Sequence, residues 1–246
     1  MIFYFSATGN SRWVAERLAA LTGDELFNMA DFLREGRVPA LSAGTVRVGV
    51  VFPIHSWYVP APVLRFLSQL AVPASVYRYA VCTCGDDVGR GLSRLSRHFP
   101  LDAAWSVQMP NTYVPMFDLD APELARQKVA RARAFLSVIA EAVVRKERAW
   151  CVREGGFPRC KTYVVYPLFK LFCIKTKDFR VDEACISCGR CEQNCPVSAI
   201  RLVDGRPVWS DACIHCMACL HGCPVNAIRY GTGTKKKGQY RLEDYL

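Results

Sequence analysis

The chain has 246 residues, of which 51% are hydrophobic and 22% are charged, so it holds enough apolar material for a buried core. This composition excludes a disordered, collagen-like or coiled-coil protein. The formal net charge of +10 raises the question of nucleic acid or an anionic membrane as a partner. The basic excess lies mostly in 126–180 without the interleaved basic and aromatic residues of a nucleic-acid surface, so we do not expect nucleic acid as a partner.

Cysteine is the unusual feature of the composition. Eight of the 13 cysteines fall between Cys185 and Cys223, which is typical of a metal site in a reducing compartment and not of a secreted disulfide scaffold. The chain opens without the basic start and cleavage site of a secretory signal, and nowhere has about 18 apolar residues in a row. We therefore expect a cytoplasmic protein that does not span a membrane.

The first 150 residues alternate short β-rich apolar runs with helical periodicity. Strands are predicted at 2–6, 25–29, 46–53, 78–84 and 103–109, and helices at 10–21, 61–70, 88–98 and 121–148. This alternation predicts an α/β fold in which helices cover both faces of a parallel sheet. Five strands suit a flavodoxin-like, doubly wound order.

After this region the regular pattern stops at Gly155-Gly156. The apolar run 163–174 is interrupted by Pro167 and Lys170, which makes it too short and too charged to cross a bilayer. We divide the chain into a first α/β domain (1–150), a connector (151–180), a small α+β domain that contains the clustered cysteines (181–231) and a C-terminal tail (232–246).

An internal repeat carries the cysteines. Residues 184–201 and 212–229 align at an offset of 28, and each copy reads C-x2-C-x2-C-x3-C-P. Thiols two residues apart can bind three corners of one iron-sulfur cube, and the fourth, followed by proline, reaches the other cube. Zinc is the competing interpretation, although a structural zinc site takes four ligands as two pairs. Because four thiols per copy complete a ligand set, we expect His215 and His221 to be exposed or to lie outside the ligand shell.

The repeat resembles that of two-cluster bacterial 4Fe-4S ferredoxins over 182–230. The resemblance implies interleaved ligands for two clusters. One set is Cys185, Cys188, Cys191 and Cys223, and the other is Cys213, Cys216, Cys219 and Cys195.

A second candidate site follows the first predicted strand. Ser6, Thr8, Gly9, Asn10 and Ser11 belong to a short loop that leads directly into an amphipathic helix. A helix start offers free N–H groups, glycine permits close approach, and the hydroxyls add donors, so the loop suits a phosphate. It resembles the phosphate loop of flavodoxins, which implies FMN; an empty helix cap is the simpler alternative.

Loops after three later strands are expected to complete the flavin site, because ligands of doubly wound folds lie over the carboxyl ends of the strands. Trp57 and Tyr58 are candidates for stacking on the flavin ring or for packing at a domain interface. The backbone of Thr83, Cys84 and Gly85 is a candidate for its polar edge, and Tyr113 for a cap over the pocket or a packed turn.

As a whole the chain is similar to the flavodoxin/ferredoxin fusion proteins of anaerobic bacteria, although 55–58 departs from the usual Tyr and Gly of that family. This implies an electron-transfer protein that passes electrons between two 4Fe-4S clusters, FMN and a redox partner protein. The alternative is a reductase with its own small organic substrate and His55 as proton donor. A third hypothesis is a redox-sensing protein that binds a partner through 233–246, against the simpler interpretation of Lys235, Lys236 and Lys237 as part of a solvated tail.

Overall fold

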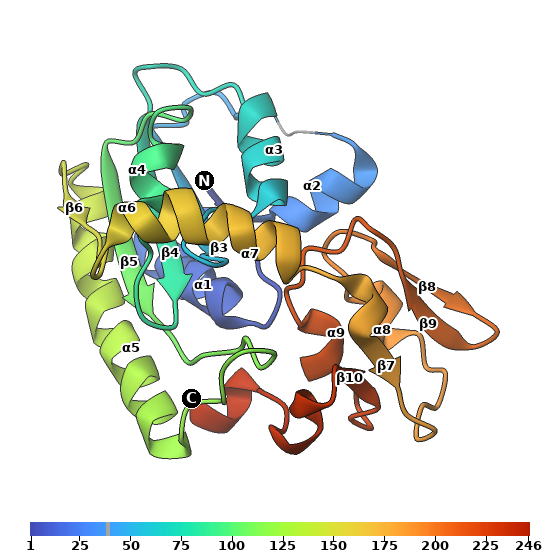
Figure 1. Cartoon of the computed structure of the whole chain (residues 1–246). Coiled ribbons are helices and arrows are strands. Elements are labelled where there is room, and N and C mark those ends of the chain that lie inside the picture. The colour runs from blue at the N-terminus through green and yellow to red at the C-terminus, as the bar shows by residue number, and fades with distance from the viewer. Residues whose placement is uncertain (38–39) are drawn as a thin grey trace.

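A parallel six-stranded sheet organises the first part of the chain in the computed structural model, which describes residues 1–37 and 40–246 (Figure 1). Its strands are β1 (Ile2–Tyr4), β2 (Leu26–Asn28), β3 (Arg47–Pro53), β4 (Tyr77–Cys84), β5 (Ala103–Gln108) and β6 (Trp150–Cys151). The order β2-β1-β3-β4-β5-β6 confirms the predicted α/β doubly wound fold. The sixth strand was not predicted, because two exposed residues carry no periodic pattern.

Helices cover both faces of the sheet. On one face α1 (Asn10–Thr22) and α5 (Pro122–Val144) bury a core that includes Leu18, Tyr79 and Leu136. On the other, α2 (Met29–Glu35), α3 (Ala61–Gln69) and α4 (Gly91–Leu95) pack over Phe3 and Phe52. The unpredicted helix α2 is capped by Asn28, whose side chain accepts a hydrogen bond from the N–H of Ala30 in the first turn.

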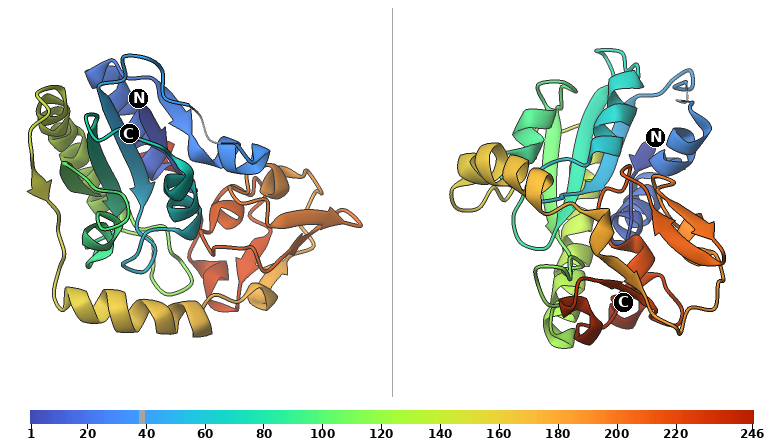
Figure 2. Two further views of the ribbon diagram at one scale, coloured as in Figure 1. Left: turned by 90° about the horizontal axis from the view of Figure 1, so that it is seen from above. Right: turned by 45° about the vertical axis from the view of Figure 1, so that its right-hand side comes forward.

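The connector forms a continuous helix where the sequence predicted none. It consists of α6 (Pro158–Cys160), the π-helical turn η1 (Lys161–Val165) and α7 (Tyr166–Phe172), and it runs along one side of the molecule to the C-terminal region (Figure 2). Pro167 has no N–H, so the α-helical ladder cannot continue unchanged through it, and the π turn directly precedes it. Across the described residues, no helix combines the length and the apolar character needed to cross a membrane.

Two small antiparallel sheets build the C-terminal region. They pair β7 (Phe179–Val181) with β10 (Ile228–Tyr230), and β8 (Ile200–Val203) with β9 (Arg206–Trp209). The remaining elements are α8 (Arg190–Gln193), α9 (Ala218–His221), η2 (Thr176–Asp178), η3 (Gly233–Lys236) and η4 (Leu242–Tyr245). Short strands around a cysteine-rich core give a small ferredoxin-like region.

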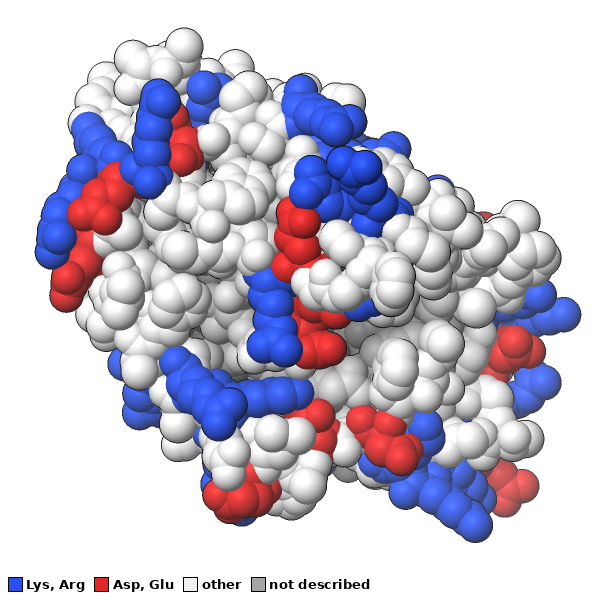
Figure 3. Space-filling view, turned by 60° about the vertical axis from the view of Figure 1, so that its left-hand side comes forward, with Lys and Arg blue, Asp and Glu red and all other residues white. Residues whose placement is uncertain are grey.

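The C-terminal segment packs against the rest of the molecule. Thr234, Tyr240 and Leu242 are buried, and Leu242 joins the core between α1 and α5. Lys235 and Lys236 are exposed, as solvated lysines are, while the residues on either side of them pack against the protein. Lys and Arg side chains are spread over the face drawn in Figure 3 with carboxylates among them, so the positive charge on this face is not gathered in one patch.

Gly49 in β3 leaves no room for a side chain, because a Cβ there would lie 2.3 Å from the buried ring of Tyr79. We expect Gly49→Ala to lower the free energy of unfolding by about 1–3 kcal/mol. Gly156→Ala, where nothing lies within 4 Å, is the matched control. Thermal unfolding followed by circular dichroism measures both, and equal stability of the two variants would contradict the packing described here.

Candidate functional site

The structure gathers the eight repeat cysteines around two hollows. Four thiols line the first, together with mostly apolar residues: Cys185, Cys188, Cys191 and Cys223. Four line the second: Cys195, Cys213, Cys216 and Cys219. Each group takes three cysteines from one repeat and the fourth from the other, which is the interleaving that the ferredoxin resemblance implies.

The backbone of the two repeats follows the same path. Left-handed residues recur at the repeat offset in three pairs: Ser187 and His215, Gly189 and Met217, and Ser198 and Asn226. The fourth cysteine of each copy also accepts the same hydrogen bond, from Ala199 N–H to Cys195 Sγ and from Ala227 N–H to Cys223 Sγ, each 3.2 Å long. Such N–H groups stabilise a thiolate, and the two sites are therefore equivalent in backbone chemistry.

Burial of the thiols opposes their ionisation. It raises the pKa of Cys216 to about 12 and also raises the pKa values of Cys191, Cys213 and Cys219. Thiolates are the metal-binding form, so cationic iron has to supply the electrostatic stabilisation that water would otherwise provide.

The spacing of the thiols fits a cluster better than a single ion. Nowhere in residues 1–37 and 40–246 do three His, Cys, Asp or Glu side chains come together as ligands of one metal ion. Four thiols nevertheless surround each hollow. A cube of iron and sulfide holds four thiolates farther apart than a single zinc ion does, because zinc binds its four sulfurs at about 2.3 Å.

The second hollow faces the sheet domain. Ile214 and Val197 line it and also pack against the core beneath α3 and α4. At the first hollow, Cys188 and Ile186 are exposed. The two sites therefore differ in surroundings, because the first has exposed lining residues and two lining residues of the second pack against the sheet domain.

Two histidines join the second repeat to the loop after β5. Nδ1 of His215 lies 2.7 Å from the hydroxyl of Tyr113. The N–H of Tyr240 donates to Nδ1 of His221, so its other ring nitrogen carries the proton and donates to the carbonyl of Thr112 at 2.8 Å. Both histidines are buried and line the contact between the two parts, so the expectation that they are exposed is wrong; their alternative place outside the ligand shell agrees with the structure.

The sequence held an unused signal for this contact. Where the first repeat has Gly189, Arg190, Glu192 and Gln193, the second has Met217, Ala218, Leu220 and His221. All four residues of the second copy are buried. Comparing the repeats position by position identifies the copy that packs against another surface.

The proposed phosphate loop lies at the start of α1. Gly9 precedes the helix with φ of 100°, a conformation that favours glycine. Ser11 and Thr83 share a 2.7 Å hydrogen bond between hydroxyls, and Thr8 donates to Thr112 at 3.3 Å. The buried hydroxyl of Ser6 has no hydrogen-bond partner within the described residues. This unpaired donor at a helix start fits an anionic phosphate.

The C-terminal segment contacts this loop. The hydroxyl of Tyr240 donates to Oδ1 of Asn10 at 2.6 Å, while Nδ2 of Asn10 donates to the carbonyl of Pro110. Leu242 approaches Gly9 so closely that a Cβ added there would lie 3.8 Å from its side chain. The loop is thus held by the C-terminal segment and by the loop after β5.

Trp57 and Tyr58, the candidates for stacking on the flavin ring, contact other side chains of the protein. Tyr58 stacks on Tyr166 of α7 with ring centroids 4.6 Å apart and lies beneath the Arg94 guanidinium. Trp57 lies beneath Lys161, and its carbonyl accepts a hydrogen bond from Thr162. Both residues therefore lie against the connector helix.

The loop after β4 lies at the same edge of the sheet. The carbonyl of Gly85 accepts a hydrogen bond from Lys128, which also pairs with Asp120. Burial raises the pKa of Cys84 to about 12, so its thiol stays neutral. Tyr113 packs its ring against Phe169 and His215 at the boundary between the two parts of the chain, as a packed turn does.

Residues 184–228 match the family described as the 4Fe-4S dicluster domain. The C-terminal region is therefore an iron-sulfur region of ferredoxin type. No curated protein matches the chain.

Several solved structures resemble the chain distantly. A putative flavoprotein from Bacteroides eggerthii is 20% identical, with a TM-score of 0.36, over 56% of this chain and 96% of the other. The Trp repressor binding protein from Bacillus subtilis is 13% identical, with a TM-score of 0.38, over the same shares. An FMN-dependent NADH-azoreductase from Bacillus anthracis, solved with FMN, is 9% identical, with a TM-score of 0.33, over 56% and 98%. Likenesses at this level establish nothing about what this chain binds.

Loss of the Tyr240 hydroxyl leaves Oδ1 of the buried Asn10 without its partner. We expect Tyr240→Phe to lower the free energy of unfolding by about 1–3 kcal/mol. Tyr245→Phe alters the ring that stacks on Tyr240 and is the matched control. Chemical denaturation measures the difference, and a Tyr240→Phe variant as stable as the control would show that the bond contributes nothing.

Burial lowers the pKa of His55 to about 4, whereas an unfolded histidine titrates near 6.5. As the pH falls below about 6.5, His55 is protonated in the unfolded chain but stays neutral in the folded chain. Protonation therefore favours the unfolded chain, and the free energy of unfolding falls until about pH 4. We expect His55→Gln to make the free energy of unfolding fall less steeply from about pH 7 to about pH 5. Exposed His98→Gln is the control, and identical slopes for both variants would contradict the burial effect.

Proposed function

We propose that this chain is an electron-transfer protein that holds two 4Fe-4S clusters and FMN and passes electrons among them and to a redox partner protein. The observation that carries the proposal is the grouping of eight thiols around two hollows, the second facing the sheet domain. When bound, each cluster carries one electron, and a flavin carries one or two.

The residues define the role of each part. Cys185, Cys188, Cys191 and Cys223 hold the cluster nearer the solvent, and Cys213, Cys216, Cys219 and Cys195 hold the cluster nearer the sheet. A partner protein therefore meets the chain at the exposed rim around Cys188 and Ile186. The division into 1–150, 151–180, 181–231 and 232–246 follows these roles.

FMN is included in the proposal because the loop before α1 suits its phosphate group. The start of α1 supplies N–H groups, and Ser6 supplies a hydroxyl that no protein atom in the described residues engages. Trp57 and Tyr58 pack against the connector helix. The backbone of Thr83, Cys84 and Gly85, at the same edge of the sheet, therefore contacts the flavin ring in this proposal.

The reductase alternative gains no support from His55. Because burial lowers its pKa to about 4, this side chain is neutral at physiological pH and does not present the protonated imidazolium of a proton donor. Nothing else in the described residues singles out a group for acid chemistry above a flavin.

Protein purified without oxygen should contain about eight iron atoms, about eight sulfides and about one FMN per chain. Cys223→Ser and Cys185→Ser should each lower iron to about four atoms and remove the same electron paramagnetic resonance signal. Cys195→Ser and Cys213→Ser should remove the other. Colourless protein, bound zinc, or a flavin that stays oxidised while dithionite bleaches the clusters would contradict the proposal.

Removal of the unpaired hydroxyl tests the flavin separately. Ser6→Ala should weaken FMN binding by about tenfold or more, the loss expected for one hydrogen bond to a charged group, while iron content stays unchanged. Ser68→Ala, on the exposed side of α3, is the control. Fluorescence titration of the flavin measures both, and equal affinities would place the phosphate elsewhere.

A further inference from the structure

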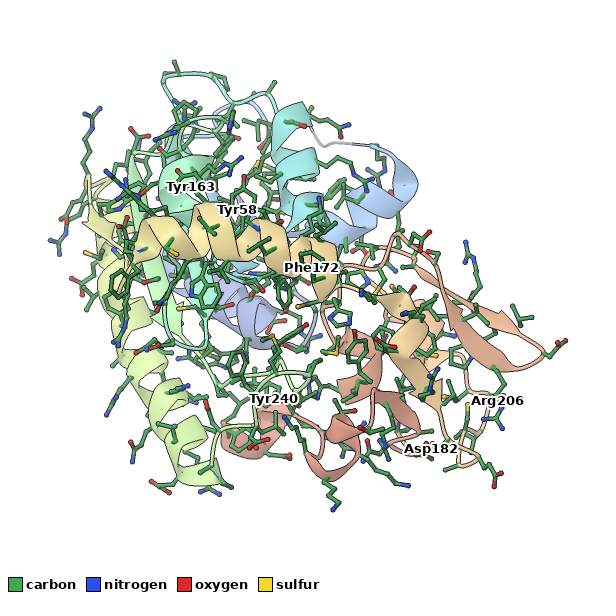
Figure 4. All side chains as sticks on the ribbon, viewed as in Figure 1. Tyr58, Tyr163, Phe172, Asp182, Arg206 and Tyr240 are labelled. Atoms are coloured by element: carbon green, nitrogen blue, oxygen red, sulfur yellow. The ribbon has the colours of Figure 1, made fainter. Side chains whose placement is uncertain are left out.

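The helix formed by α6, η1 and α7 turns an apolar face to solvent along its length. From Val164 to Phe172 its exposed apolar side chains recur at intervals of three or four, which places them in one stripe. They are Val164 (52% exposed), Leu168 (50%), Leu171 (68%) and Phe172 (60%), and Phe157 (86%) lies directly before the helix. Figure 4 shows Phe172 at the end of α7 that approaches the ferredoxin-like region and Tyr163 farther back along the same helix.

The opposite side of this helix accounts for its attachment to the protein. Thr162 is fully buried and donates to the carbonyl of Trp57. Tyr166 stacks on Tyr58, and Phe169 packs edge-on against Tyr113. Because these contacts hold the helix in place, the exposed stripe is not needed for folding.

Phe157 is unfavourable in two ways. It has a φ of 49°, a left-handed conformation that bulky residues rarely adopt, and its ring is almost wholly in water. A bulky residue with a strained backbone and an exposed ring is expected to gain its interaction from another surface.

The charged residues within the helix segment itself have one sign. Residues 155–177 contain five Lys or Arg residues and no Asp or Glu. Lys161 is paired with Asp87. The other four are exposed: Arg159, Lys170, Lys175 and Lys177.

We propose that this helix lies in the headgroup layer of an anionic lipid bilayer, with the stripe inserted and the four exposed bases on lipid phosphates. An apolar face flanked by Lys and Arg without acidic residues is the pattern of an interfacial helix. A symmetric contact with a second copy of the chain would bring the same bases together. A transient redox partner would meet a more mixed and polar surface.

The test uses flotation of anaerobically prepared holoprotein with two kinds of vesicle. The protein should bind vesicles of phosphatidylglycerol and phosphatidylcholine and not vesicles of phosphatidylcholine alone. Raising the salt from about 0.1 M to about 1 M shortens the Debye length from about 10 Å to about 3 Å and should release most of it.

Two matched pairs of variants locate the contact. Leu171→Ser should lower vesicle binding by about tenfold, the effect of withdrawing one large apolar side chain, whereas Val138→Ser, 60% exposed on α5, should leave it unchanged. The double variant Lys170→Gln with Lys175→Gln should lower binding by about tenfold or more, whereas Lys235→Gln with Lys236→Gln should not. Unchanged iron content and circular dichroism verify folding.

Several results of these experiments would overturn the proposal. Holoprotein that binds neither vesicle, that binds both equally, or that responds equally to matched and control variants refutes a lipid contact at this helix. A dimer in sedimentation velocity that Leu171→Ser dissociates shows that a second copy covers the stripe instead.

Discussion

Two buried histidines of the second cysteine repeat hold the two parts of the chain together. His215 bonds to Tyr113 and His221 bonds to Thr112, so two consecutive residues of the loop after β5 hold the repeat at two points. The N–H of Tyr240 donates a hydrogen bond to the other ring nitrogen of His221, and the hydroxyl of Tyr240 donates to Asn10 at the start of α1. This network sets where the second group of thiols lies relative to the carboxyl ends of the strands.

An internal duplication has become asymmetric through this contact. The two copies share their backbone path and their N–H to sulfur bonds. Met217, Ala218 and Leu220 stand where the first copy has Gly189, Arg190 and Glu192, and all three are buried. Exposure and polarity around a cluster help set its potential, so two sites of identical ligand chemistry are given different environments.

The connecting helix serves the interface on one side and leaves the other apolar side uncovered. Its inner residues pack against Trp57 and Tyr58, two aromatic residues that were candidates for contacts to the flavin ring. The phosphate loop, in contrast, keeps one buried hydroxyl without a partner within the described chain, at Ser6. Helix packing thereby restricts the candidate flavin contacts to the phosphate loop and the backbone after β4.

The sequence by itself determined the features that are local or periodic. Apolar runs separated by helical periods predicted the parallel sheet, and the cysteine spacing predicted the two interleaved groups, because both patterns depend on neighbours a few residues apart. Only the tertiary structure decided the helix at Pro158–Phe172, the burial of His215 and His221, and the packing of Tyr240 against Asn10. These depend on residues up to 230 positions apart along the chain, and no short-range pattern encodes which distant surfaces meet.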